Sequence, residues 1–402
     1  MKAIGDLFGK RSDQAPPSVD PAVKPPVSVT IDELNRSVNA LAKQVGQLRG
    51  LVYQQEDMLS EALRRAGWLD ESESSHQQSL QRALRAIAEH EDIIVGPWTG
   101  EVGFELLYWI PFLGWLAEQG LAQRRVTVVS RGGTASWYRH LAARYIDLLE
   151  LMTPEEFRER TAGPKKQVDK SRELDRDVIE RVKRQLGLEK AGQIHPSSMF
   201  RLFAPLFRKR AGVELVESFA SHRRLLPPEP EPIGGSLVLP PQYVVSKFYF
   251  SKAFPDTTAN REFVAGVLAS ISRHVPVVLL STAVRLDEHA DFAASSGSAV
   301  HVVDTHVVPE RNLDLQTRII AGARGFIGTY GGFSYLAPLL GVRSVSFFSR
   351  RGGFESHHLD LADRVFDQLL PGGFVALDRR AHTLVEPAIS RWLTTSHETV
   401  HA

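Results

Sequence analysis

The sequence predicts an α/β protein with two domains of this class in tandem, preceded by a long coiled-coil helix. Three observations support this prediction. From residue 93 onward, short β-branched runs alternate with helical stretches, which is typical of domains built on a mainly parallel sheet. A proline cluster, PPEPEP, divides this region into two halves. Ahead of it, apolar residues recur at alternating spacings of three and four.

Composition excludes several classes of protein. The 402 residues contain 48 Lys and Arg against 47 Asp and Glu, so the chain has no net charge that would attract a nucleic acid. Cysteine is absent, which removes disulfides, zinc-thiolate sites and thiol nucleophiles. The sequence has no apolar run long enough to span a bilayer and no apolar core of a secretory signal. We therefore expect a cytoplasmic protein that binds no nucleic acid.

The N-terminal region is predicted to form a tail followed by a coiled-coil helix. Residues 1–29 are rich in Pro, Ser and Lys and indicate a disordered tail, whose first residues either fray or make a peripheral contact with the inner membrane. Thr30 and Glu33 fit a capping box, so a helix should begin there and cover 30–66. Its narrow heptad seam favours a homo-oligomer through residues 31–66, and packing on the chain's own globular part is the alternative. The seam residues are Ile31, Leu34, Val38, Leu41, Val45, Leu48, Val52 and Leu59.

The remaining chain divides where the pattern of apolar, charged and proline residues changes. We expect a helical connector at 67–92, a first α/β domain at 93–226 with a charge-rich helical insertion at 153–192, a linker at 227–242 and a second α/β domain at 243–402. The expected elements are, in order, a strand at IIVGPW, a helix ending near Gln119, a strand at RVTVVS, a helix at 138–149, strands at YVVSKFYF, VPVVLLST, AVHVVD, GFIGTYGG and SVSFFS, and helices at 260–274, 313–323 and 333–340.

The first glycine turn, GPWTGEVGFE, joins a strand to a helix. Backbone amides approach a ligand closely at such a turn, so Gly100 and Gly103 are candidates for contact with an acceptor or an anion. The spacing matches neither a Walker loop nor a dinucleotide fingerprint. Glu101 and Glu105 suit a general base that removes a proton from a sugar hydroxyl, and capping of the helix start is the alternative.

Aromatic residues surround this turn and the helix after it. They would fit a wall on which carbohydrate stacks, but their helical spacing favours the core. They are Trp98, Tyr108, Trp109, Phe112 and Trp115.

Two other strand ends carry cations. Arg131 follows RVTVVS and would suit an anionic partner, although a structural arginine fits equally well. Lys247 and Lys252 are five residues apart beside hydroxyl side chains. Such a pair would stabilise the charge on a departing diphosphate, and a solvated turn is the alternative.

The most specific signal is GFIGTYGGFSYL, a buried strand that ends in a glycine turn and opens a helix. Amides at such a helix start hold phosphates without a cation, which selects Thr329, Gly331, Gly332 and Ser334 as anion-binding residues. The acidic neighbours of His289 and the pair His357 and His358 lack the spacing of a metal motif, so we expect no metal site.

Together these motifs resemble those of the GT-B glycosyltransferase superfamily, over about residues 93 to 380. The stretch is similar to uncharacterised bacterial polysaccharide-biosynthesis enzymes of that fold. The resemblance implies two Rossmann-like domains, a nucleotide-sugar donor on the GFIGTYGGFSYL turn, neutralisation of its diphosphate by Lys247 or Lys252, and an acceptor facing Glu101 or Glu105. It also implies that no cofactor and no metal are bound.

One departure from the family pattern bears on mechanism. Many retaining members carry a glutamate in the helix after the glycine turn, where this chain has Leu336, Ala337 and Pro338. The resemblance therefore implies an inverting transfer of a sugar from a nucleotide-sugar donor to a glycan or lipid-linked acceptor, in bacterial surface polysaccharide biosynthesis. The alternatives are a nucleotide-sugar epimerase of the same fold and a non-catalytic coiled-coil scaffold.

Overall fold

The computed structural model describes residues 73–162, 167, 172–228, 238–281, 289–293, 299–303 and 308–381. All of them belong to one compact unit, Glu71–Ala402. The predicted tail, the coiled-coil helix and the oligomer through residues 31–66 lie outside the described residues, and so does most of the predicted linker.

The first sheet of the described residues has four parallel strands in the order β3-β2-β1-β4. Its strands are β1 (Asp92–Val95), β2 (Arg125–Ser130), β3 (Arg144–Asp147) and β4 (Gly192–Ile194). Ile93, Ile94 and Val95 are fully buried, as expected of a strand covered on both faces. Helix α2 (Glu73–Glu89) packs against α8 (Ser197–Leu202), which places the predicted helical connector on this half.

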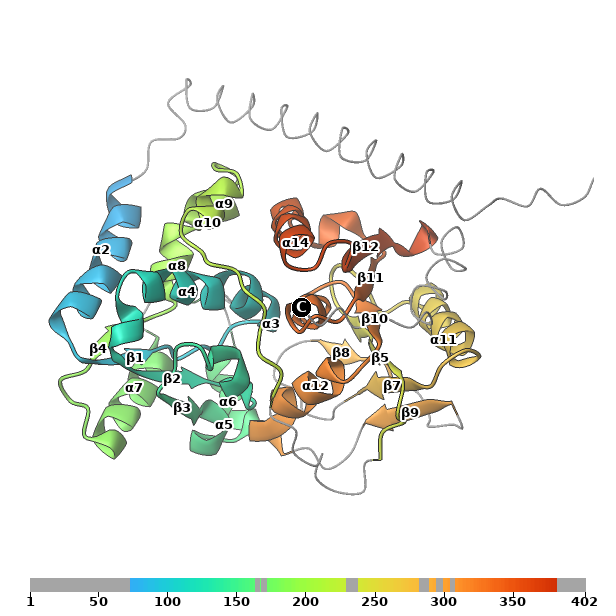
Figure 1. The fold of residues 1–402 in the computed structure, drawn as a ribbon, viewed down its shortest axis with the longest axis horizontal. Helices are drawn as coiled ribbons and strands as arrows, with labels where there is room; N and C mark the ends of the chain where they lie inside the picture. Colours follow the sequence, from blue (N-terminus) through green and yellow to red (C-terminus); the bar gives the residue numbers. More distant parts are fainter. Residues whose placement is uncertain are drawn as a thin grey trace, which may run out of the picture. The chain divides into compact units, whose positions relative to one another are not determined.

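Helices surround this sheet in Figure 1. They are α3 (Val102–Phe104), α4 (Ile110–Glu118), α5 (Leu148–Leu151), α6 (Pro154–Thr161), α7 (Glu173–Leu186), α8 (Ser197–Leu202), α9 (Ala204–Phe207) and α10 (Glu214–Glu217), with a π-helix at Glu105–Trp109 and 3-10 turns at Leu121–Gln123 and Thr134–Tyr138. Helix α3 continues through the π-helix into α4, so one unbroken helical segment follows the first glycine turn.

The helix predicted at 138–149 is wrong. Residues 144–147 form β3, which pairs with β2, and α5 begins only at Leu148. Asp147 ends the strand because its carboxylate caps α5 by accepting a hydrogen bond from the amide of Leu149. The apolar spacing of this segment fits a helix as well as a strand, and the pairing with β2 decides for the strand.

The second sheet has six parallel strands among the described residues, in the order β12-β11-β10-β5-β7-β9. They are β5 (Val244–Lys247), β7 (Val277–Leu280), β9 (Val300–Val303), β10 (Gly325–Thr329), β11 (Ser344–Phe348) and β12 (Phe374–Asp378). β6 (Tyr249–Phe250) and β8 (Ala290–Asp291) form a separate short antiparallel sheet, and β6 contacts β10. The predicted parallel α/β class is confirmed in both halves.

The second half has four α-helices in the described residues: α11 (Thr258–Ser272), α12 (Asn312–Ala321), α13 (Gly332–Leu339) and α14 (Ser356–Leu369), with 3-10 turns at Pro309–Arg311, Arg351–Gly353 and Arg379–Ala381. Thr257 caps α11 by accepting a hydrogen bond from the amide of Asn260. No helix in the described part of the chain is both long and apolar enough to cross a membrane.

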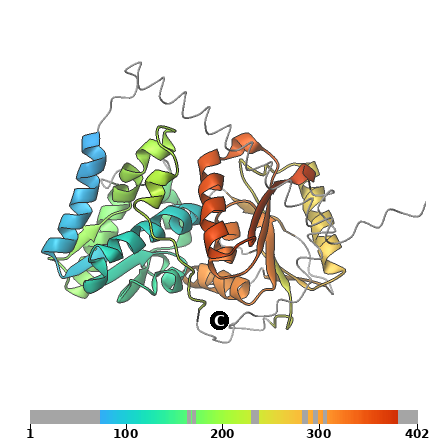
Figure 2. The ribbon, with the colours of Figure 1, turned by 45° about the horizontal axis from the view of Figure 1, so that its top comes forward.

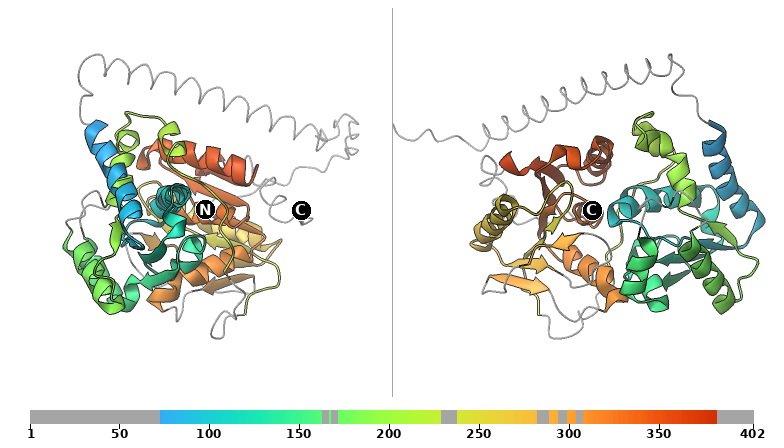
Figure 3. Two further views of the ribbon diagram at one scale, coloured as in Figure 1. Left: turned by 60° about the vertical axis from the view of Figure 1, so that its left-hand side comes forward. Right: turned by 180° about the vertical axis from the view of Figure 1, so that it is seen from behind.

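Three helices of the second half contact the first half. Helix α13 packs against α3, and the amide of Leu313 on α12 donates to the carbonyl of Gly132 at 2.6 Å. Arg364 of α14 pairs with Glu214 of α10 at 2.8 Å. Figure 2 shows α14 in red beside the first half, and Figure 3 shows α12 in orange against it from behind. One hydrophobic cluster includes buried residues of both halves, so they share a core.

Candidate functional site

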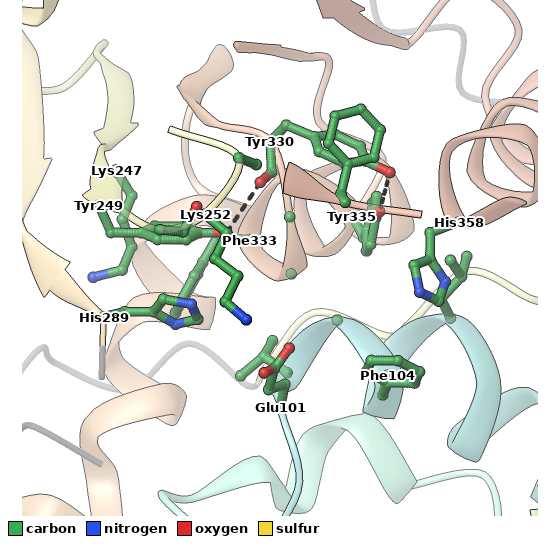
Figure 4. Close-up of a pocket in the computed structure, with 18 of the residues that line it drawn as sticks. Glu101, Phe104, Lys247, Tyr249, Lys252, His289, Tyr330, Phe333, Tyr335 and His358 are labelled. Carbon is green, nitrogen blue, oxygen red and sulfur yellow. Dashed lines mark hydrogen bonds between the residues drawn. The ribbon is translucent and has the colours of Figure 1, made fainter. Parts of the chain in front are cut away.

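A cavity of about 560 Å³ opens between the two halves at the carboxyl ends of central strands. The first half contributes the start of the long helical segment and Arg131. The second half contributes the segment after β5 and parts of α12, α13 and α14. Figure 4 shows side chains from both halves directed into this space.

The two glycine turns meet at the cavity. A Cβ atom on Gly332 would lie 2.7 Å from the amide nitrogen of Gly103, so the start of α13 leaves no room for a side chain at this position, whereas a Cβ on Gly103 would make an ordinary contact at 3.5 Å. Gly331 has a φ of 147°, and a Cβ on it would collide with the hydroxyl of Tyr249. These glycines therefore let the two backbones approach each other, and their expected contact with a ligand stays a prediction.

This meeting brings two helix starts to one cavity. The first amides of a helix have no partner inside the helix, and the helix dipole places partial positive charge at that end. Val102 and Gly103 occupy such positions in the first half, and Gly332 and Phe333 occupy them in α13. All four residues line the cavity, so its floor attracts negative charge.

Glu101 lies at the centre of this arrangement. It occupies the N-cap position of α3, but its side chain makes no capping hydrogen bond. Its carboxylate is half-buried, lines the cavity and points into it in Figure 4. Capping, the alternative reading of this residue, is therefore not what the geometry shows.

Glu105 is placed differently from the expectation. It is fully buried and is absent from the residues that line the cavity. Its carboxylate accepts hydrogen bonds from Ser130 Oγ at 2.7 Å, Tyr138 Oη at 2.6 Å and the guanidinium of Arg131 at 3.0 Å. Burial raises the pKa of Glu105, and the positive charge of Arg131 opposes that shift. A carboxylate enclosed in this way holds Arg131 and does not face an acceptor.

Arg131 and Gly100 belong to the same buried network. Arg131 is 5% exposed and also donates a hydrogen bond to the carbonyl of Gly100. A Cβ on Gly100 would lie 2.9 Å from the ring of Trp98, so this glycine is needed for packing, and it does not line the cavity. Arg131 lines the cavity with its charge already paired, which agrees with the structural alternative for this residue.

The two predicted lysines differ in environment. Lys247 is 4% exposed, and its Nζ lies 2.9 Å from Asp291 and 4.9 Å from the ring centre of Phe333. Its charge is therefore largely compensated within the protein. Lys252 is exposed, lines the cavity and extends toward its middle in Figure 4, and no ion pair is found for it among the described residues.

The predicted hydroxyl contacts are corrected by the structure. Thr329 Oγ1 accepts from the amide of Tyr249 at 3.0 Å and donates to its carbonyl at 2.9 Å. Ser334 Oγ accepts from the amide of Gly331 at 3.1 Å and donates to its carbonyl at 2.7 Å. Both residues are fully buried and do not line the cavity. They shape the turn, and the turn borders the cavity through Tyr330, Gly331, Gly332 and Phe333.

Sequence reasoning missed an aromatic group at the cavity. Phe104 and Phe354 are half-buried and line it, and so does His358, whose Nδ1 shares a 2.6 Å hydrogen bond with Tyr108 Oη. Tyr108 lies on the π-helix, where it is a core residue at 1% exposed, as expected, and also borders the cavity. Trp98, Trp109 and Phe112 are core residues, as expected.

Comparisons with known proteins give similarity at the level of the fold. No family model matches the chain, and no curated protein matches its sequence. The solved structures that it resembles are glycosyltransferases. A family 9 glycosyl transferase of Veillonella parvula is 13% identical, with a TM-score of 0.43 over 76% of this chain and 93% of that one. Heptosyltransferase WaaC of E. coli, solved with ADP, is 14% identical, with a TM-score of 0.40 over 75% and 99%.

A third similar structure is larger than this chain. The dodecameric iron-containing heptosyltransferase TibC of enterotoxigenic E. coli, in complex with ADP-D-beta-D-heptose, is 14% identical, with a TM-score of 0.34 over 66% of this chain. The chain spans 61% of the length of that protein.

Proposed function

We propose that this protein is a glycosyltransferase that moves a sugar from a nucleotide-sugar donor to a glycan or lipid-linked acceptor. The observation that carries the proposal is the single cavity in which Glu101, Lys252 and two opposed helix starts meet. A transfer reaction needs a base for the incoming hydroxyl and a stabilising environment for the leaving group. The two halves supply one of these each.

The leaving diphosphate is assigned to the second half. Gly332 and Phe333 begin α13 and line the cavity, and the side chain of Lys252 extends into it. The free amides of this helix start and the Lys252 ammonium together stabilise negative charge on the departing phosphate oxygens. Lys247 lies deeper and holds Asp291, so its role is to support the pocket. We therefore replace the expected two-lysine clamp by one lysine and a helix start.

The acceptor is assigned to the first half. Glu101 takes the proton of the acceptor hydroxyl as that oxygen attacks the anomeric carbon, and the bond from this carbon to the diphosphate breaks with its electron pair on the diphosphate. The reaction inverts the anomeric centre, because it is a single displacement from the opposite face. Its charges are handled by Glu101, Lys252 and backbone amides, so the proposed mechanism needs no metal.

Binding tests the donor assignment. Isothermal titration calorimetry with a panel of ADP-, UDP-, GDP- and dTDP-sugars should find one that binds, and Lys252→Met should weaken it by about 10-fold or more. Incubation of that donor without acceptor separates transfer from epimerisation, because an epimerase alters the sugar while it stays attached to the nucleotide. No binding by any member of the panel would favour a non-catalytic scaffold.

A further inference from the structure

The cavity has two chemically different ends. In Figure 4, Lys247, Tyr249 and His289 lie at one end, while Phe104 and His358 lie at the other. Glu101 and Lys252 lie between them. The end opposite Lys247 is called the aromatic end here and comprises Phe104, Leu107, Tyr108, Tyr330, Phe354 and His358.

The apolar surface of the aromatic end is built from both halves. Phe104 comes from the first half and packs against Phe207 and His358 with ring centres 5.7 and 5.0 Å apart. Phe354 comes from the second half and packs against Tyr330 at 4.6 Å. Both phenylalanine rings are only half-buried and line the cavity, so part of each ring remains available for contact.

Two pairs of polar groups at this end are already bonded to each other. Tyr108 Oη and His358 Nδ1 share a hydrogen bond of 2.6 Å, and Oη of the neighbouring Tyr335 donates to Tyr330 Oη at 2.7 Å. A sugar hydroxyl that gives up water here has to compete with these hydrogen bonds for a partner, which costs free energy. The burial of aliphatic or aromatic carbon carries no such cost and is favourable, because it removes apolar surface from water.

We propose that the aromatic end binds an apolar aglycone of the acceptor, attached next to the hydroxyl that Glu101 deprotonates. This inference rests on the proposed function, because it assigns a part of the acceptor. Phe104 follows Glu101 by three residues, and at about 1.5 Å per residue the two lie roughly one helical turn apart. The aglycone therefore begins close to the reacting hydroxyl, as in a lipid-linked or aryl glycoside and unlike a free glycan.

Calorimetry on the full chain with methyl, propyl, hexyl and phenyl β-D-glucopyranoside tests this. Each methylene group that enters the aromatic end should tighten binding by up to about 4-fold, so hexyl should bind at least about 10-fold more tightly than methyl. The phenyl glucoside shows whether an aryl group has the same effect as an alkyl chain. Equal affinities of the methyl, hexyl and phenyl glucosides would overturn the proposal.

Variants test whether the gain in affinity from methyl to hexyl glucoside arises at the aromatic end. Phe104→Ala and Phe354→Ala should each remove most of the gain from methyl to hexyl, and Phe104→Leu should keep most of it. If Phe104→Ala does not fold, Phe354→Ala alone tests the loss. Leu226→Ala, at an exposed apolar residue outside the cavity, is the control and should leave the gain intact. A gain kept in full by the alanine variants at Phe104 and Phe354 would place the chain elsewhere and refute the proposal.

The two proposals can fail separately. Nucleotide-sugar binding without a chain-length effect would refute the aromatic-end assignment and leave the transferase assignment standing. A chain-length effect that depends on Phe104, in a protein that binds no nucleotide sugar, would refute the transferase assignment alone.

Discussion

Replacing Glu105 by glutamine tests whether this carboxylate is part of the scaffold. The residue is fully buried and accepts three hydrogen bonds, one of them from Arg131, whose side chain is only 6% exposed. The substitution keeps an acceptor oxygen but leaves the buried guanidinium without a counter-charge. Breaking a buried ion pair by removing one partner costs about 3 to 5 kcal/mol. We expect a loss near the lower value, because the amide oxygen still accepts from Ser130 or Tyr138.

Urea denaturation followed by tryptophan fluorescence measures this loss. The double variant Glu105→Gln with Arg131→Met should be less destabilised than Glu105→Gln alone, because it removes both buried charges. Arg125→Ala is the matched control, since Arg125 pairs with Asp92 on the surface with its side chain 66% exposed, and its loss should change the stability far less than Glu105→Gln does. The reasoning is refuted if Glu105→Gln unfolds at the same free energy as the wild type.

Other predictions concern pH, packing and the two lysines. Burial lowers the pKa of His222 from 6.5 to about 4, so this group stabilises the fold above pH 6.5 and that stability is lost as the pH falls toward 4. His222→Gln should remove about 3 kcal/mol of this loss, measured by urea denaturation at pH 6.5 and at pH 4. His274→Gln, at an exposed position, is the control and should not remove it. Gly332→Ala should lower the melting temperature and weaken donor binding, because its Cβ would meet the Gly103 amide at 2.7 Å; an unchanged melting temperature would contradict the close contact. Lys247→Met should lower the free energy of unfolding by about 1 to 3 kcal/mol, because it leaves Asp291 unpaired. Lys252→Met should instead weaken donor binding with little change in stability. The reverse pattern in denaturation and calorimetry would contradict the assignment of the two lysines.

Part of the site could be predicted from the sequence because it depends on local geometry. A glycine turn between a buried strand and a helix places backbone amides at the carboxyl edge of a parallel sheet, which is where Gly103, Gly331 and Gly332 lie. The sequence also selects Glu101, because it lies on the first glycine turn at the start of a helix, and Lys252, because it comes directly after β5 and β6.

Other features depend on docking between elements and have no local signal. Glu105 is only four residues after Glu101, but the packing of Ser130, Arg131 and Tyr138 around it decides that it is buried. His358 lies on α14 and reaches the cavity only because that helix packs against the first half. Residues 144–147 became a strand through pairing with β2, which no periodicity in the segment reveals.

The most direct test of the central claim is the release of nucleoside diphosphate from the best-bound nucleotide sugar by Glu101→Gln. We expect a turnover at least about 100-fold below that of the wild type, with the donor dissociation constant within about 2-fold, because the base acts on the acceptor and not on donor binding. Glu262→Gln, an exposed glutamate of α11, is the control and should keep full turnover. Full turnover by Glu101→Gln, with its fold intact, would contradict the role of Glu101 as the base.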